Sequence, residues 1–117
     1  MINRVTFQGY LGGEPHLTKT DGGQSVCNVK VANTVKWKND EGELKEKTTW
    51  ATLAFFGHGA ETFFQHHHKG DLCLVEGRLS TDNWIHKETG ERREKMKIVV
   101  ENWHFPGKKT NITKGDE

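Results

Sequence analysis

Threonines and apolar residues fill positions 48–57. This stretch is β-branched and aromatic, lacks charge and ends in a glycine, which predicts a strand. Because side chains alternate faces along a strand, Trp50 and Phe56 lie on one face with only small residues between them, whereas Leu53 and Phe55 lie on the other. The second face is typical of a core. The first offers two rings about 20 Å apart, as a flat, stackable ligand requires. A central sandwich strand, buried on both sides, would explain the same pattern.

Four further stretches share strand-like patterning: residues 2–11, 26–37, 71–85 and 92–105. Gly9 and Gly77 lie inside the first and third of these stretches, which suggests bulges or bends of the kind that small barrels use to turn a corner. The sequence Thr20-Asp21-Gly22-Gly23 is a hairpin turn signal. The chain is therefore predicted to be rich in short turns and strands.

One helix is predicted, from about Ala60 to Lys69, with Gly70 as its C-cap. Its end contains three consecutive histidines, residues 66–68, which raise the question of a metal site. Consecutive helix positions point about 100° apart, so the three imidazoles cannot converge on one ion. We expect no metal here, because the favourable helix dipole explains histidines at a helix C-terminus.

Five strands, with one helix between strands 3 and 4 and glycines inside strands 1 and 4, predict an all-β fold: a five-stranded OB-fold Greek-key barrel. The length of 117 residues suits one domain. We place that domain at residues 1–105. Residues 106–117 are polar, and we expect them to form a short disordered tail.

Composition narrows the functional classes only slightly. The formal net charge of +1 does not indicate a nucleic-acid or membrane partner, although it leaves room for a local basic track. No apolar run approaches the length of a membrane span, so no membrane association is expected. Cys27 and Cys73 are far apart and lack a metal-ligand pattern, which indicates buried free thiols in a reducing compartment. A cytoplasmic location follows as an expectation.

Four aromatic residues are candidates for ligand binding: Trp37, Trp50, Phe56 and Trp84. Trp37 lies between two lysines at a predicted hairpin tip, and Trp84 lies at another. Rings on these elements could form one path along which unpaired bases stack. Each stacked base contributes about 1–3 kcal/mol of binding free energy, largely independent of the nucleotide sequence. An exposed hairpin end with a half-buried tryptophan would explain Trp37 equally well.

Several short motifs follow one another in a characteristic order: Asn3-Arg4-Val5, Gly9-Tyr10-Leu11, Glu14-Pro15, Trp37, Thr49-Trp50, Phe56-Gly57, Ala60-Glu61, Lys69-Gly70, Val75-Glu76-Gly77-Arg78-Leu79, Trp84 and the turn at Gly90 with Arg92 nearby. In this order and spacing the chain resembles bacterial and phage single-stranded DNA-binding proteins, over about residues 1–105. The resemblance implies binding of single-stranded DNA during replication, recombination and repair, and assembly as a homotetramer.

The resemblance also implies roles for individual residues. The four aromatics would stack on bases, and Arg4, Lys38 and Lys69, which match positions that are commonly basic in the family, would contact phosphates. Three features depart from the family pattern: Ser80 and Asp82 stand where relatives often carry basic residues, His58 replaces a common lysine, and no acidic tip ending in phenylalanine follows Glu117. We therefore expect a less positive hairpin. The missing tip indicates either a truncated chain or a phage- or plasmid-borne form that coats DNA without recruiting repair enzymes by that route.

Three other functions compete with the binding of single-stranded DNA. A nuclease would need paired carboxylates or a nucleophile with its base, and the sequence offers no convincing set, so we expect no catalytic residues and no cofactor. A primosomal or replication accessory adaptor with an OB fold would need fewer stacking aromatics. An RNA chaperone stays open, because stacking does not distinguish the sugars.

Overall fold

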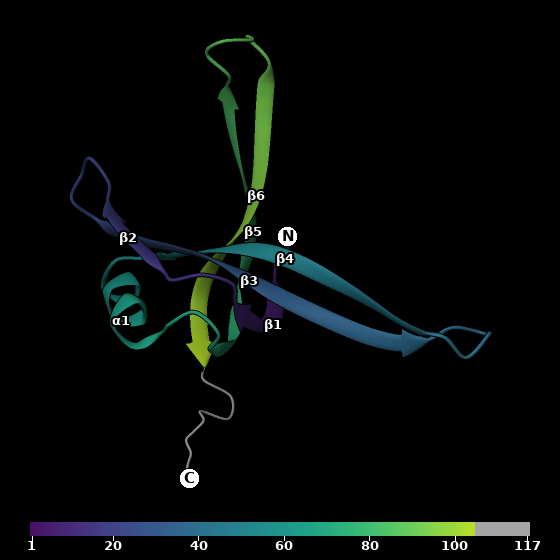
Figure 1. Cartoon of the computed structure of the whole chain (residues 1–117). Helices are drawn as coiled ribbons and strands as arrows, with labels where there is room; N and C mark the ends of the chain where they lie inside the picture. Colours follow the sequence, from purple (N-terminus) through teal and green to yellow (C-terminus); the bar gives the residue numbers. More distant parts are fainter. Residues whose placement is uncertain (105–117) are drawn as a thin grey trace.

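The computed structural model describes residues 1–104 (Figure 1). The predicted tail at residues 106–117, and the end of the last predicted strand at position 105, lie outside the described residues. The described part contains these elements: β1 (Val5–Leu11), β2 (His16–Lys19), β3 (Ser25–Lys38), β4 (Leu44–Phe56), α1 (His58–His66), β5 (Leu72–Ile85) and β6 (Arg92–His104).

Five of the strands close into a barrel. The sheet order is β1-β5-β6-β4-β3-β2, and an additional β1–β3 pairing joins the ends of the five longer strands. Neighbouring strands are antiparallel except β4 and β6, which run parallel. The predicted all-β fold with a five-stranded barrel and one short helix is thus confirmed. The helix follows β4, which is the third of the five barrel strands along the chain.

The short strand β2 was not predicted. It continues along the edge of β3 where β1 stops, so that Leu11 is paired with Val31 and, further along, Thr18 is paired with Val26. Four residues are too few to show a reliable period of two. Only the neighbouring edge of β3 makes this segment a strand.

The glycines inside strands mark places where backbones approach closely, as predicted. A Cβ atom at Gly9 would lie 2.6 Å from the carbonyl oxygen of Ala32, and one at Gly77 would collide with the backbone of Val99. Gly77 also sits at an irregularity in the pairing of β5 with β6. A side chain at either position would therefore prevent the barrel from closing.

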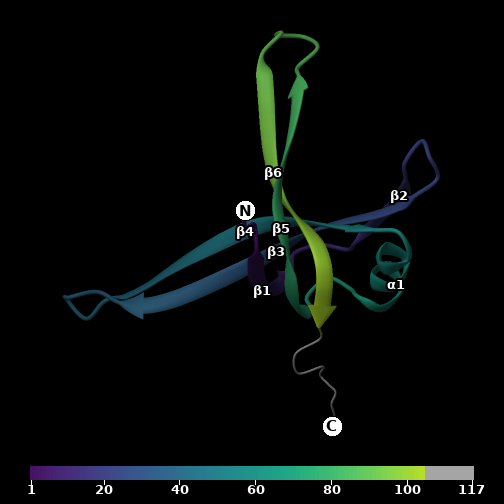
Figure 2. The ribbon, with the colours of Figure 1, turned by 180° about the vertical axis from the view of Figure 1, so that it is seen from behind.

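Two long hairpins project from the barrel in different directions (Figures 1 and 2). In the β3–β4 hairpin the pairing is continuous from Val26 with Phe56 to Lys38 with Leu44. In the β5–β6 hairpin it reaches Ile85 with Arg92. The outer halves of both hairpins are exposed, so they contribute surface rather than core.

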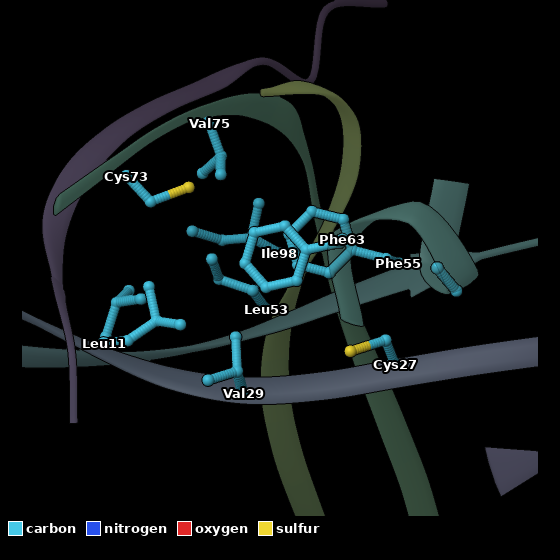
Figure 3. Close-up of a cluster of buried hydrophobic side chains, with 11 residues drawn as sticks. Leu11, Cys27, Val29, Leu53, Phe55, Phe63, Cys73, Val75 and Ile98 are labelled. Atoms are coloured by element: carbon cyan, nitrogen blue, oxygen red, sulfur yellow. The ribbon is translucent and has the colours of Figure 1, made fainter. Parts of the chain in front are cut away.

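The barrel interior is filled by one hydrophobic cluster (Figure 3). Leu53 and Phe55 of β4 are fully buried in it, which confirms the predicted core face of that strand. The ring of Phe55 stacks on Phe63 of α1 with centroids 3.9 Å apart, and Trp103 of β6 meets Phe55 edge-on at 5.4 Å. The helix is therefore fixed to the barrel by aromatic packing.

The predicted bounds and C-cap of the helix are wrong. It begins at His58 and ends at His66, and the backbone of His67 is already extended. Gly70 has a positive φ of 92° but uses it in the turn after the helix, where Asp71 donates to the carbonyl of His68. The chain leaves the helix early because the His67 ring folds back onto Phe63, with centroids 4.0 Å apart.

The dipole explanation is also wrong for His67. Its side chain is buried, and this burial lowers its pKa to about 4, against the smaller opposing effect of the Phe63 carbonyl. A neutral imidazole gains little from a helix dipole. His67 is instead a core residue.

Both cysteines are free and buried, as predicted. Burial raises the pKa of Cys27 to about 11, and burial together with the Asp71 carboxylate raises that of Cys73 to about 12. Both side chains therefore stay protonated thiols at neutral pH. Within residues 1–104, no helix is long and apolar enough to cross a membrane, and no group of three His, Cys, Asp or Glu side chains is placed to hold a metal ion.

Candidate nucleic-acid interface

Trp50 lies in an open groove of about 850 Å³ on the outside of the barrel. The groove is formed by the loop between β1 and β2, by the start of β2, and by β3, β4 and β6. Lys30 and Lys95 line it together with Trp50, and Glu14 lines it as well. The indole is 58% exposed. A large aromatic surface is thus open to a ligand beside two cationic side chains.

Phe56, at the end of the same strand, is linked to the β5–β6 hairpin through Lys97. The Nζ atom of Lys97 lies 5.8 Å from the centroid of the Phe56 ring, within the range of a cation–π contact. The same Nζ atom is 2.9 Å from a carboxylate oxygen of Asp82 on β5. Phe56 itself is 37% exposed, so part of its ring is free to contact a ligand.

Trp84 lies on the side of the β5–β6 hairpin that carries these lysines. The pairing places Trp84 opposite Arg93, Asp82 opposite Lys95 and Ser80 opposite Lys97. Because directly paired residues point to the same side of a sheet, all six share one face of the hairpin. Lys95 lines the Trp50 groove and Lys97 faces Phe56, so this face adjoins both rings.

Trp50, Phe56 and Trp84 therefore belong to one surface together with Lys30, Lys95 and Lys97. We refer to these six residues as the aromatic surface. Each of its three rings is between 37% and 58% exposed. Two of its rings come from β4 and one from β5, and the sheet brings the two strands together through β6, which pairs with both.

Trp37 is arranged differently. It is paired with Lys45, whereas Trp50 is paired with Ala32, an odd number of positions away along the hairpin. Side-chain alternation therefore puts Trp37 and Trp50 on opposite faces of the β3–β4 hairpin. Trp37 is 47% exposed, and its part in binding stays a prediction.

The three predicted cations are not among the residues of the aromatic surface. Arg4 precedes β1 and follows Asn3, whose side chain makes two hydrogen bonds with the backbone of Leu79. Lys38 ends β3 at the hairpin tip. The backbone N–H of Lys69 donates to the carboxylate of Glu14, 3.1 Å away. All three side chains are exposed, and their contact with phosphates stays a prediction.

Sequence reasoning missed Lys30, Lys95 and Lys97. Lys95 and Lys97 continue a run of basic residues at every second position that starts at Arg93, and this signal was visible in the sequence. Such a run places three cations on one face of a strand. Lys30 has no comparable signal, because its place beside Trp50 depends on how β3 and β4 pair.

Comparison with known proteins identifies the family of this chain. The model of the single-strand binding protein family matches residues 2–106. The chain belongs to this family. Two bacterial members named single-stranded DNA-binding protein 1 are similar to it over most of their length. The one from Xylella fastidiosa is 35% identical over 97% of this chain and 83% of its own. The one from Chlorobaculum tepidum is 33% identical over 92% of this chain and 67% of its own.

Solved structures of family members share the fold. The Plasmodium falciparum protein, solved in complex with single-stranded DNA, superposes with a TM-score of 0.79 at 23% identity, over 91% of this chain and 96% of that one. A deletion mutant of the Thermus aquaticus protein gives a TM-score of 0.78 at 24% identity, over 92% of this chain and 52% of that one. Both matches support an OB-type barrel.

Replacing Asp82 should strengthen the electrostatic part of DNA binding. Asp82 neutralises Lys97 within the aromatic surface. We expect Asp82→Asn to release this lysine, and Asp82→Lys to add a second cation. Affinity for oligo-dT at low salt should rise in that order. The slope of log K against log salt should steepen by about 0.7 for each additional phosphate contact.

Fluorescence anisotropy of labelled oligo-dT at several salt concentrations measures both quantities. Asp21→Asn, in the β2–β3 turn, makes the same change in net charge away from the aromatic surface and serves as the control. An unchanged affinity and slope in both Asp82 variants would mean that the β5–β6 hairpin does not approach the DNA backbone.

Proposed function

We propose that this protein binds single-stranded DNA without sequence specificity by stacking bases on Trp50, Phe56 and Trp84. The observation that carries the proposal is the aromatic surface itself: three partly exposed rings on one side of the barrel, interleaved with three lysines. Every base has a face that can stack, which makes such binding tolerant of sequence. The lysines supply the positive charge that a phosphate backbone requires.

The wider role follows from family membership. We propose that the protein coats and protects single-stranded DNA during replication, recombination and repair in the cytoplasm. It would act as a binding protein and not as an enzyme. Arg4, Lys38 and Lys69 would extend the phosphate track, and Trp37 would offer a further stacking position to a strand that crosses the edge of the β3–β4 hairpin.

Direct binding measurements test this function. Labelled oligo-dT should bind at low salt and lose affinity as salt increases, whereas a duplex of equal length should bind far more weakly. RNA of the same length and base composition, used as a competitor, distinguishes a DNA-binding protein from an RNA chaperone. Preferential binding of the duplex, or cleavage of the oligonucleotide in Mg²⁺, would contradict the proposal.

We also propose that the chain assembles as a homotetramer made of two dimers. Only Tyr10 and Leu11 of β1 pair with β3, and the preceding residues of β1 pair with β5 alone. The carbonyl of Gln8 accepts a hydrogen bond from the Asn33 side chain of β3. Within residues 1–104, the part of β1 before Gln8 therefore has one open edge. An open edge can pair with a second copy across a two-fold axis.

Light scattering at micromolar concentration should return four times the 13.4 kDa mass of one chain. The assembly would let one DNA strand contact several aromatic surfaces in turn. A monomer mass under these conditions would rule out the tetramer without affecting the assignment of the aromatic surface.

A further inference from the structure

The indole of Trp50 rests directly on the backbone of Gly12. A Cβ atom at Gly12 would lie 2.8 Å from Cη2 of Trp50 and closer still to Cζ3, a distance that real side-chain contacts do not show. The next nearest atom, the carbonyl oxygen of Lys30, would be 3.6 Å away. The space that a side chain would occupy at Gly12 is therefore taken by this one ring.

The backbone around Gly12 is held in place. Gly12 donates to the carbonyl of Lys30 at 2.9 Å, which ties it to β3. Its neighbour Leu11 donates to the carbonyl of Asp71 at 2.9 Å, accepts from Gly70 at 2.8 Å, and is buried in the core. The loop thus has little freedom to retreat from a methyl group at position 12, so Trp50 would have to move.

β3, which lies between Trp50 and Gly12, has a small residue where the indole crosses it. The residue paired with Trp50 on β3 is Ala32, which is small. Gly12 lies on the far side of β3 through its hydrogen bond with Lys30. The indole can therefore reach across β3 and settle on Gly12, with the remainder of the ring open to the groove.

We infer that Gly12 is a positioning residue for DNA binding, which seats the Trp50 indole in the orientation that stacks a base. A ring that is already fixed loses less conformational freedom when the ligand arrives. This inference rests on the proposed function, because it assigns Gly12 a role in the same aromatic surface.

Gly12→Ala should weaken the affinity for oligo-dT by several-fold to about tenfold. This is smaller than the loss expected when a stacking ring is removed altogether. Gly22→Ala is the matched control, because a Cβ there meets only Thr20 Oγ1 at 3.9 Å and φ is not positive. It should bind like the unmodified protein. In a Trp50→Ala background, Gly12→Ala should have no further effect on affinity.

A readout without DNA separates this inference from the proposed function. Acrylamide quenching of Trp50, obtained by comparing each protein with its Trp50→Phe counterpart, should change in Gly12→Ala and stay the same in Gly22→Ala. If the unmodified protein fails to bind oligo-dT, the proposed function fails, while the quenching result still decides whether Gly12 seats the ring.

Two results would overturn the inference. One is unchanged Trp50 quenching in Gly12→Ala. The other is an equal loss of affinity whether Trp50 is present or replaced by alanine, which would show that Gly12 acts through the barrel and not through the ring. Thermal melts of all variants check that the comparison is made on folded protein.

Discussion

Phe55→Ala should destabilise the fold by about 3–5 kcal/mol and leave DNA binding by the folded protein intact. Phe55 is 1% exposed, stacks on Phe63 of α1 and meets the edge of Trp103. Its removal would leave a cavity where the helix joins the barrel. Urea or thermal unfolding measures the loss of stability, and an oligo-dT titration at low temperature measures binding.

The adjacent change, Phe56→Ala, should behave in the opposite way. Phe56 is 37% exposed and belongs to the aromatic surface, so its removal should cost about 1–3 kcal/mol of binding free energy with little loss of stability. Because both residues are phenylalanines next to each other in β4, differences in strand propensity largely cancel. A Phe56→Ala protein that melts early yet binds normally once folded would show that the two faces of β4 have been interchanged.

Acidification should destabilise the protein through His67. The pKa of His67 is about 4 in the folded state against 6.5 for an ordinary histidine, mainly because the ring is buried. Between these values the unfolded chain binds the proton and the folded chain does not. The stability that a neutral His67 provides is therefore fully present above pH 6.5 and is lost as the pH falls towards 4, by roughly 3 kcal/mol in total.

Denaturant unfolding at pH 7 and at pH 4.5 measures this loss. Carboxylates titrate over the same range, so the informative quantity is the difference between the unmodified protein and His67→Phe, which keeps a ring against Phe63 but cannot be protonated. His66→Phe, at an exposed position next to it, is the matched control. If the His67→Phe protein loses as much stability on acidification as the unmodified protein, His67 is not the titrating group.

The alternation of side chains was enough to divide β4 into two faces. A period of two depends only on local backbone geometry, so Leu53 and Phe55 could be placed on one face and Trp50 and Phe56 on the other from the sequence alone. The same pattern also suits a strand buried on both sides, and the exposure of the Trp50 face is known from the structure. The glycines inside the strands were equally informative, because a residue without a side chain in a strand interior indicates that another backbone segment approaches closely there.

The relation between Trp37 and Trp50 could not be predicted. It depends on the register of the β3–β4 hairpin, which the turn at residues 39–43 sets, and there the side chain of Asn39 accepts hydrogen bonds from the backbone of Glu41 and Glu43. A shift of the pairing by one residue would bring the two tryptophans to the same face. Sequence patterns do not fix such a shift.

Contacts between distant segments explain the remaining differences between the predictions from the sequence and the structure. The helix ends early because the ring of His67 packs on Phe63, and β2 exists because β3 offers it an edge. Lys30 joins Trp50 only through the pairing of β3 with β4. Each of these features is decided by tertiary structure, which overrides local propensity.

The central claim is that Trp50, Phe56 and Trp84 form one stacking surface for single-stranded DNA. Intrinsic tryptophan fluorescence during titration with oligo-dT, repeated at several salt concentrations, tests it most directly. We expect strong quenching at low salt, which is reduced when either Trp50 or Trp84 is replaced by phenylalanine and persists when Trp103, which is partly buried against the core, is replaced. An oligonucleotide that binds without quenching, or an absence of quenching at low salt, would contradict it.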